Sequence, residues 1–261
     1  MTLITLTTDF GLKDGNVGVM KGVIWSRAPQ AQIVDLSHLI SPQNVREASL
    51  ILGRALPYFP DGTVYVVVVD PGVGTERRPI AVRLGEQFLV GPDNGVFTLA
   101  YEYAETQDWP LHVVLLDRPQ YWLPQVSYVF HGRDVFAPVA GSLAAGVPLE
   151  ELGRPIYDPV RIDFPQPEAI DGGLRGEIIH IDHFGNLSSC ILRQHLGERP
   201  GATIRISGVN IHGMVKTFGE RPDGELIALY GSSGNLIVSV VNGDAAKRLG
   251  ARLGDKIEVF F

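Results

Sequence analysis

The sequence has a single cysteine, Cys190, among its 261 residues. A disulfide framework within the chain is therefore excluded, and such a composition suits the reducing cytoplasm. Basic residues are also scarce, because 22 lysines and arginines stand against 29 acidic residues, which gives a net charge of −7. We expect no nucleic-acid partner, since binding of that kind needs a basic surface.

Long apolar runs are missing as well. No stretch reaches the roughly 18 apolar residues that a membrane-spanning helix needs, so we expect no membrane association. The chain starts with a strand-like run, MTLITLTTDFG, which lacks the basic start and the cleavage site of a signal peptide. We therefore expect a cytoplasmic protein.

The first part of the sequence alternates strand-like and helix-like runs. The strand-like runs are LITLTT, AQIVDLS and TVYVVVV, and IAVRLGEQFLVGP predicts a hairpin around Gly85 and Glu86. Apolar residues at helical spacing predict helices over residues 16–28, 45–59, 94–104 and 132–145. This alternation predicts an α/β domain with an open, mostly parallel sheet flanked by helices.

The composition changes in the segment RPIYDPVRIDFPQPEAIDGG, which holds four prolines and two glycines and predicts a linker. Short alternating runs such as LRGEIIHI and NLIVSVV follow, and they predict a smaller all-β, barrel-like domain. We predict an N-terminal α/β domain over residues 1–160, a linker over 161–173 and a C-terminal β-barrel domain over 174–261.

Two predicted strands run into an aspartate, Asp9 in LTTDFG and Asp70 in VVVDPG. Ligands bind open α/β sheets beyond the carboxyl ends of the strands, so the two carboxylates could face one pocket. The alternative is that each aspartate caps a turn or a helix.

The turn DPGVG after Asp70 is rich in glycine and would bring Arg77 back to the strand end. It lacks the Lys-Ser/Thr ending of a phosphate loop and the spacing of a dinucleotide-binding fingerprint, so we reject both. A surface arginine is the alternative for Arg77, and it suits Arg78 better.

Further polar segments stand at predicted loops. In YVFHGRDVFAP, His131 precedes a predicted helix in a glycine-containing loop, which suits proton chemistry. IHIDHFGNLSSC and YGSSGNL place Asp182, Asn186 and Ser232 in turns between strands. Recognition of a base edge or an amino-acid head group is one interpretation of these turns, and on composition alone plain hairpin turns explain them better.

Metal and serine-nucleophile chemistry are both disfavoured. Four hard or borderline ligands are present, namely Asp9, Asp14, Asp70 and His131. No His-x-His, His-Glu-x-x-His or cysteine cluster accompanies them, so we predict no metal site. A Gly-x-Ser-x-Gly elbow for a serine nucleophile is absent from the sequence.

Six segments together carry a resemblance to a known family: TTDFGLKDGNVGVMKG, VVVVDPGVGTERRPI, GPDNGVF, FHGRDVFAP, IDHFGN and GSSG. In this order they cover essentially the whole chain, which resembles the S-adenosyl-methionine hydroxide adenosyltransferase family. Members hydrolyse S-adenosyl-methionine and are related to the fluorinase and chlorinase that attach halide to the same carbon. The resemblance implies the two domains described above, no cofactor, and a homotrimer with each active site between the N-domain of one subunit and the C-domain of the next.

The resemblance also implies roles for individual residues. The catalytic positions are Asp70, Arg77 and His131. The substrate-binding positions are Asp9, which binds the ribose, Asp14, Asp182, Asn186, Ser232 and, through backbone near it, Val240. Relatives often carry an acidic residue in the strand that follows Ser232, where this chain has Ile237. That departure puts one adenosine contact in doubt or hands it to the backbone.

The implied reaction is in-line attack of a water or hydroxide at ribose C5′, which gives adenosine and L-methionine. The sulfonium leaves as a neutral thioether, so no general acid is needed. Asp70 and His131 would hold the water and take its proton, directly or through each other, while Arg77 orients the carboxylate.

Two other functions stay open at this point. One is a protein that binds adenosine or S-adenosyl-methionine without turnover. The other is a halide adenosyltransferase, whose known members carry an uncharged residue at the position of Asp70. A carboxylate there would repel a halide by about 4 kcal/mol at roughly 4 Å and an effective dielectric of about 20.

Overall fold

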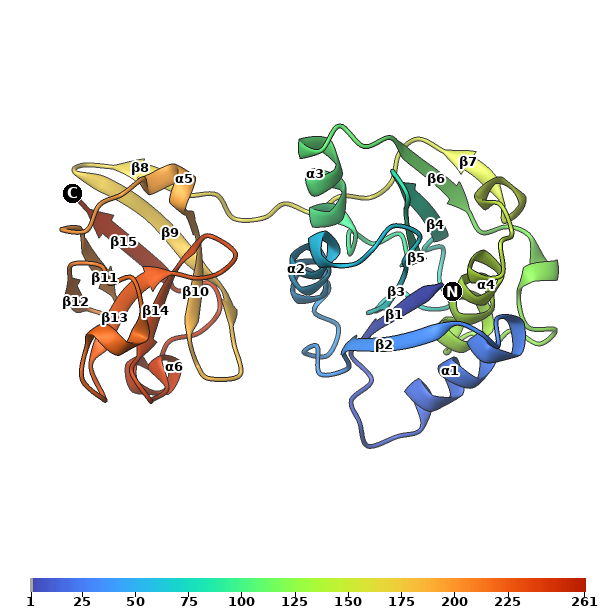
Figure 1. Cartoon of the computed structure of the whole chain (residues 1–261), viewed down its shortest axis with the longest axis horizontal. Helices are drawn as coiled ribbons and strands as arrows, with labels where there is room; N and C mark the ends of the chain where they lie inside the picture. Colours follow the sequence, from blue (N-terminus) through green and yellow to red (C-terminus); the bar gives the residue numbers. More distant parts are fainter. Residues whose placement is uncertain (1) are drawn as a thin grey trace. The chain divides into compact units, whose positions relative to one another are not determined.

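The computed structural model describes residues 2–261. The chain divides into two compact units (Figure 1), of which the first ends at Ile162 and the second spans Asp163–Phe261. Within residues 2–261, no helix has the length and apolar character needed to cross a bilayer.

A seven-stranded sheet forms the centre of the first unit, in the order β2-β1-β3-β5-β4-β6-β7. Its strands are β1 (Leu3–Thr8), β2 (Gln32–Ser37), β3 (Val64–Val68), β4 (Pro79–Leu84), β5 (Gln87–Pro92), β6 (Leu111–Leu115) and β7 (Arg154–Ile156). Neighbours among β2, β1, β3 and β5 are parallel, whereas the β5–β4, β4–β6 and β6–β7 pairs are antiparallel. Since only β4 and β7 run against the others, the predicted mostly parallel sheet is confirmed.

Helices cover both faces of this sheet, as predicted: α1 (Asn16–Arg27) and α4 (Ala137–Ala144) on one face, and α2 (Val45–Ala55) and α3 (Thr98–Thr106) on the other (Figure 1). Strand β3 shows why, because all five of its residues are buried. Val64, Val66 and Val68 join the core that includes α1 and α4, and Tyr65 and Val67 join the core that includes α2 and α3. Burial of each such side chain contributes about 1.5–3 kcal/mol.

Some helices differ from the prediction in their bounds or type. The helix predicted over 45–59 ends at Ala55, and a 3₁₀ turn, η1 (Leu56–Tyr58), follows because Pro57 lies within it. The helix predicted over 132–145 starts as a π-helix, η3 (Gly132–Phe136), before α4 continues it. Other 3₁₀ turns are η2 (Pro119–Tyr121), η4 (Leu149–Glu151) and η5 (Phe218–Glu220).

The second unit is the predicted all-β, barrel-like domain. Its strands are β8 (Glu168–Ile170), β9 (Gly173–Ile181), β10 (Leu187–Leu192), β11 (Thr203–Ile206), β12 (Val209–His212), β13 (Leu226–Tyr230), β14 (Asn235–Val240) and β15 (Lys256–Phe260). They pair antiparallel in the order β12-β11-β15-β9-β10-β14-β13, and β8 pairs with β9. Strand β8 therefore gives regular structure to part of the segment 161–173, which the sequence led us to interpret as a linker.

The barrel is nearly closed. Its edge strands β12 and β13 approach each other, and the Val215 N–H donates to the Ala228 carbonyl on β13 at 3.0 Å. Two short helices, α5 (Arg193–Leu196) and α6 (Ala245–Leu249), connect strands. Alternate residues of β14, such as Leu236 and Val238, fill the main core of the unit.

Candidate functional site

Three side chains that the sequence singled out, Asp70, Arg77 and His131, are in direct contact. Arg77 donates to both carboxylate oxygens of Asp70, from Nε to Oδ1 at 3.0 Å and from Nη2 to Oδ2 at 2.5 Å. The same Nη2 lies 3.1 Å from Nδ1 of His131. The side chain of Arg77 is 7% exposed and that of Asp70 is 6% exposed, so the surface position considered for Arg77 is wrong. Together these contacts form a nearly buried carboxylate–guanidinium–imidazole cluster.

The strand directions explain why Asp70 and Arg77 meet. Asp70 follows the end of β3, and Arg77 precedes β4, which runs against the parallel strands. The start of β4 therefore lies at the carboxyl edge of the sheet, where ligands bind in open α/β folds. Between them, Gly74 has φ +76° and passes so close to the Tyr128 carbonyl that a Cβ would lie 2.2 Å from its oxygen. Only glycine fits this turn.

His131 reaches the cluster from the first residue before the π-helix η3. The neighbouring Gly132 packs against Val68, the last residue of β3. The fully buried Asp134 holds the preceding loop, because its Oδ2 accepts from the Ser127 N–H at 2.8 Å. Departures from regular helix of this kind often mark functional sites, and this one aims the imidazole at Arg77.

The cluster shifts the pKa of two of its members. Burial lowers the pKa of His131, and the positive charge of Arg77 lowers it further. Burial raises the pKa of Asp70, against the opposing pull of the Arg77 guanidinium and of His131. The imidazole is therefore held in its neutral form, and the carboxylate is a stronger base than an exposed aspartate.

Asp9 lies at the same edge of the sheet as the cluster. It follows β1, whose last residue, Thr8, is paired with Val68 of β3. Its Oδ2 accepts from the backbone N–H of Gln43 at 2.8 Å. The ring of Phe10, one residue further, meets Phe130 edge-on with centroids 5.6 Å apart, which joins the Asp9 turn to the loop before His131.

Asp14 is exposed in the loop before α1. The structure therefore gathers Asp9, Asp70, Arg77 and His131 at one edge and leaves Asp14 at the surface of that unit.

In the second unit, Asp182 and Asn186 form one tight turn. Asp182 Oδ1 accepts from the N–H groups of Phe184 and Asn186, both at 2.9 Å, and Asn186 Nδ2 donates to Oδ2 at 2.7 Å. These hydrogen bonds fit the alternative interpretation, in which Asp182 and Asn186 form a plain hairpin turn. The turn leaves Phe184 exposed at 72%.

Ser232 and Val240 differ in their surroundings. Ser232 is exposed in a turn closed by the hydrogen bond from Gly231 N–H to the Asn235 carbonyl at 2.9 Å. Val240 is buried at the end of β14 and packs in the main core. Ile237, the departure from the family pattern, belongs to a separate small cluster with Ile227, Leu229 and Val241. Its side chain is thus committed to apolar packing.

Arg78 is the clearest feature that the sequence did not reveal. Its Nε donates to Asp93 Oδ2 at 2.8 Å, and Nη1 donates to Asp158 Oδ1 at 2.8 Å. The Arg78 side chain is 30% exposed, as a surface arginine can be, but it also joins two acidic residues, which the sequence did not indicate. Asn94 was missed too, and its Nδ2 donates to the Val69 carbonyl next to Asp70 at 2.9 Å. The sequence held a signal for Asp93, because this residue directly follows a strand, as Asp9 does.

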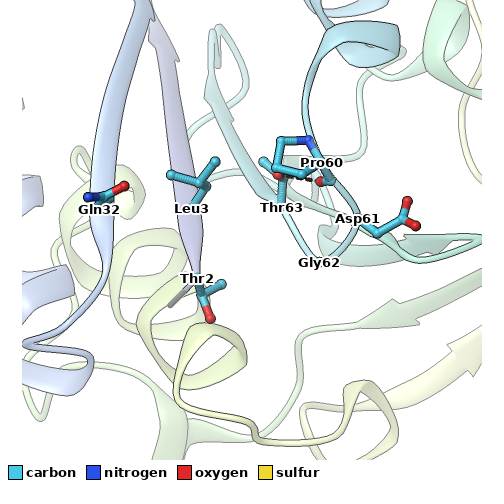
Figure 2. A pocket seen from close by; sticks show the side chains of 7 residues that line it. All are labelled: Thr2, Leu3, Gln32, Pro60, Asp61, Gly62 and Thr63. Carbon is cyan, nitrogen blue, oxygen red and sulfur yellow. Dashed lines mark hydrogen bonds between the residues drawn. The ribbon is translucent and has the colours of Figure 1, made fainter.

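Two cavities lie away from these residues. Figure 2 shows one of about 350 Å³ where β1, β2 and β3 begin, lined by Thr2, Leu3, Gln32, Pro60, Asp61, Gly62 and Thr63. It opens at the edge of the sheet opposite to Asp9 and Asp70. Another, of about 250 Å³, lies between β12 and β13. Within residues 2–261, no group of three or more His, Cys, Asp or Glu side chains could hold a metal ion.

Comparison with protein families assigns both units. Residues 4–153 match the SAM hydroxide adenosyltransferase N-terminal domain, and residues 176–258 match the corresponding C-terminal domain. The chain belongs to the SAM hydroxide adenosyltransferase family. The resemblance drawn from its sequence motifs is thereby confirmed.

Two of the relatives described next align with nearly the whole chain, and a third aligns with about three quarters of it. It is 42% identical to the (R)-S-adenosyl-L-methionine hydrolase of Thermus thermophilus, over 97% of this chain and 98% of that protein. It is 33% identical to the protein of the same name from Methanocaldococcus jannaschii, over 100% and 97% of the two chains. A fluorinase from an Actinoplanes species is 31% identical over 76% of this chain and 74% of its own length.

Two solved structures have a similar fold. An uncharacterized conserved protein from Thermotoga maritima superposes with a TM-score of 0.89 at 34% identity, with full coverage of both chains. A conserved hypothetical protein from Thermus thermophilus gives a TM-score of 0.79 at 38% identity, also with full coverage. These two proteins therefore share the fold of this chain over all the residues compared.

Proposed function

We propose that this protein hydrolyses S-adenosyl-L-methionine to adenosine and L-methionine. The observation that carries the proposal is the nearly buried contact of Asp70, Arg77 and His131 at the ligand-binding edge of the sheet. Full-length relatives named (R)-S-adenosyl-L-methionine hydrolase support the substrate.

Asp70 is the base in this mechanism. Burial raises its pKa, so its carboxylate accepts a proton more readily than an exposed aspartate. The two-pronged contact with Arg77, together with a hydrogen bond from the backbone of Gly72, fixes the plane of the carboxylate, and a remaining lone pair can accept from a water molecule. A water positioned there loses its proton to Asp70 as its oxygen attacks ribose C5′ in line with the departing sulfur.

His131 is a donor toward the water. A guanidinium has only N–H donors, so Nδ1 of His131 accepts from Arg77. A neutral imidazole that accepts at Nδ1 carries its proton on Nε2, and the lowered pKa of His131 keeps the ring neutral. The Nε2–H can therefore orient the water oxygen while Asp70 takes the proton.

Substrate-binding roles complete the proposal. Asp9 binds the ribose hydroxyls, with Asp14 in the same loop, and Asp182, Asn186, Ser232 and the backbone near Val240 bind the remaining parts of the substrate. No cofactor takes part in this mechanism. The homotrimer, the independence of metal ions and the cytoplasmic location stay predictions.

Halide transfer is the second candidate, because a fluorinase matches about three quarters of the chain. The geometry disfavours it. Asp70 presents a carboxylate where a halide would have to sit, and the repulsion amounts to about 4 kcal/mol at roughly 4 Å and an effective dielectric of about 20.

A product assay tests these alternatives. The purified protein is incubated with each sulfonium epimer of S-adenosyl-L-methionine in chloride buffer with EDTA, and nucleosides and amino acids are resolved by chromatography and mass. We expect adenosine and methionine in equal amounts, faster from one epimer. Formation of 5′-chloro-5′-deoxyadenosine would overturn the electrostatic argument. Binding of substrate without any product would identify a binding protein instead.

A further inference from the structure

His38 is a buried histidine to which neither the sequence nor the family comparison assigns a role. It directly follows β2, the strand next to β1, and is 4% exposed. The β1–β2 register shifts by one residue, from Leu6 opposite Asp35 to Thr7 opposite Ser37. Such an extra residue turns the following side chains to the other face of the sheet. Asp35 and His38, three apart, can therefore meet on one side of the strand.

The ring of His38 joins a chain of polar contacts. Its Nδ1 lies 2.9 Å from Oγ1 of Thr8, and its Nε2 lies 3.0 Å from Oδ1 of Asp35, although that approach is oblique for a hydrogen bond. Lys21 donates to the other oxygen of Asp35 at 2.6 Å. When the proton is on Nε2, this N–H is directed at the Asp35 carboxylate, and Nδ1 accepts from the Thr8 hydroxyl.

The contacts of His38 end on the turn that carries Asp9. The Thr8 hydroxyl, which bonds to the ring, also accepts from the Phe10 N–H at 3.3 Å. The carbonyl of His38 itself accepts from the Gly11 N–H at 2.8 Å. Residue 38 therefore holds the turn on both sides of Asp9, once through its side chain and once through its backbone.

The same loop also holds the carboxylate of Asp9. Five residues after His38, the N–H of Gln43 donates to Asp9 Oδ2 at 2.8 Å. Gln43 has φ +64°, an unfavourable conformation for a residue with a side chain, which the surrounding contacts must stabilise. The segment 38–43 thus fixes both the backbone and the side chain of Asp9.

The Thr8, His38 and Asp35 arrangement has the composition of a nucleophilic triad, but burial excludes that use. Thr8 is fully buried within β1, so no substrate carbon can reach its hydroxyl. A contact set that is closed to ligands and ends on a binding residue is suited to orientation.

We propose that His38, through Thr8, is a positioning residue that presents the Asp9 carboxylate to the two hydroxyl groups of the substrate ribose. This inference rests on the proposed function, since it assigns the ribose to Asp9. The inference goes beyond the proposed function, because recognition of the ribose diol would then depend on a buried side chain that no substrate touches.

The test compares adenosine with 2′,3′-dideoxyadenosine by titration calorimetry on the full chain. The wild type is expected to bind adenosine at least tenfold more tightly, because only adenosine offers the diol to Asp9. In His38→Leu, adenosine affinity should fall about tenfold while dideoxyadenosine affinity stays unchanged. His38→Asn is the matched control, because its Oδ1 takes the place of Nδ1 and can still accept from Thr8.

Thr8→Val removes the hydroxyl with little change in shape and provides a second route if His38→Leu folds poorly. It should lose the same diol preference, and Thr8→Ser should keep it. In turnover, both loss variants should raise KM for S-adenosyl-L-methionine with less than a threefold change in kcat. Equal weakening of both nucleosides, or a lower melting temperature with the diol preference intact, would overturn the inference.

The proposed function is judged separately from this inference. A wild type that binds neither nucleoside and forms no product would contradict the proposed function. A wild type that prefers adenosine, together with His38→Leu and Thr8→Val that prefer it equally, would contradict only the role of His38.

Discussion

Arg77 and Arg78 are adjacent in the sequence, and each holds an aspartate at the carboxyl end of a parallel strand. Arg77 binds Asp70, which follows β3, and Arg78 binds Asp93, which follows the neighbouring strand β5. Both carboxylates are almost completely buried, with side chains that are 6% and 1% exposed. The two pairs differ in what else they contact.

The Arg78–Asp93 pair makes its further hydrogen bonds with a neighbouring segment of the chain. Asp93 Oδ1 accepts from the Val160 N–H at 2.7 Å, and Arg78 also binds Asp158 through its side chain and its carbonyl. This pair fastens residues 158–160 to the sheet. The Arg77 pair instead extends to a titratable imidazole, His131. Of these two buried ion pairs, we therefore place in the reaction the one that also contacts a proton-carrying third group.

The largest expected difference between the two pairs is in catalysis. Asp70→Asn should lower kcat about a thousandfold, because the amide cannot accept the proton of the attacking water. Adenosine affinity should change much less. Asp93→Asn is the matched control, and it should leave kcat within about threefold. Steady-state kinetics and calorimetry on the two variants measure these effects.

A similar loss of kcat in both variants would break the comparison, since it would place the Arg78 pair in the reaction as well. Full activity of Asp70→Asn would contradict the proposed base.

A smaller difference is expected in titration. The pKa of His131 is lowered by burial and then by Arg77, so its titration midpoint should lie below 6.5. Arg77→Gln removes the second cause and should raise the midpoint. Two-dimensional NMR of the histidine ring protons measures both, with His131→Asn for assignment. An unmoved midpoint in Arg77→Gln would show that the guanidinium does not control the imidazole.

The same shift has a defined sign for stability. Between the lowered folded pKa and 6.5, the unfolded chain binds more protons at His131 than the folded chain. The stabilising contribution of His131 to folding is therefore fully present above pH 6.5. It declines as the pH falls from 6.5 toward the folded-state pKa. Denaturant unfolding at several pH values should show a weaker decline in His131→Asn than in the wild type.

The smallest expected effect on activity belongs to Arg78. Arg78→Gln leaves Asp93 buried with a weaker partner and should lower stability by about 1–3 kcal/mol. The melting temperature should fall by roughly 3–10 °C, while kcat/KM stays within about twofold. Calorimetry and kinetics on one preparation decide the point. Loss of activity at an unchanged melting temperature would contradict the structural role.

Local sequence patterns predicted much of the first unit because its elements follow local rules. The run VYVVVV indicates a strand buried on both faces, and the Gly85–Glu86 turn indicates a hairpin. The same rules did not reveal that β5 pairs with β3 while β4 turns back toward β6, because strand order depends on long-range packing. They also missed the π-helix Gly132–Phe136, whose residues fit regular helical spacing equally well.

The candidate site shows a similar limit. The nearness of Arg77 to Asp70 was predictable, since only six residues, in a glycine-rich turn, separate them. The contact between Arg77 and His131 joins residues 54 positions apart, and only the family resemblance predicted it. His38 was missed, although it follows a predicted strand as Asp9 does, because a single histidine at a strand end gives no sequence pattern that separates a positioning role from plain packing.

The close approach of Gly74 to the Tyr128 carbonyl has a dynamic consequence. A contact made by bare backbone leaves no side-chain rotamer that could give way between the two segments. We therefore expect the turn after Asp70 and the loop before His131 to move together. We expect a displacement of one segment to be passed to the other, which would limit changes in the distance between the Asp70 carboxylate and the His131 imidazole.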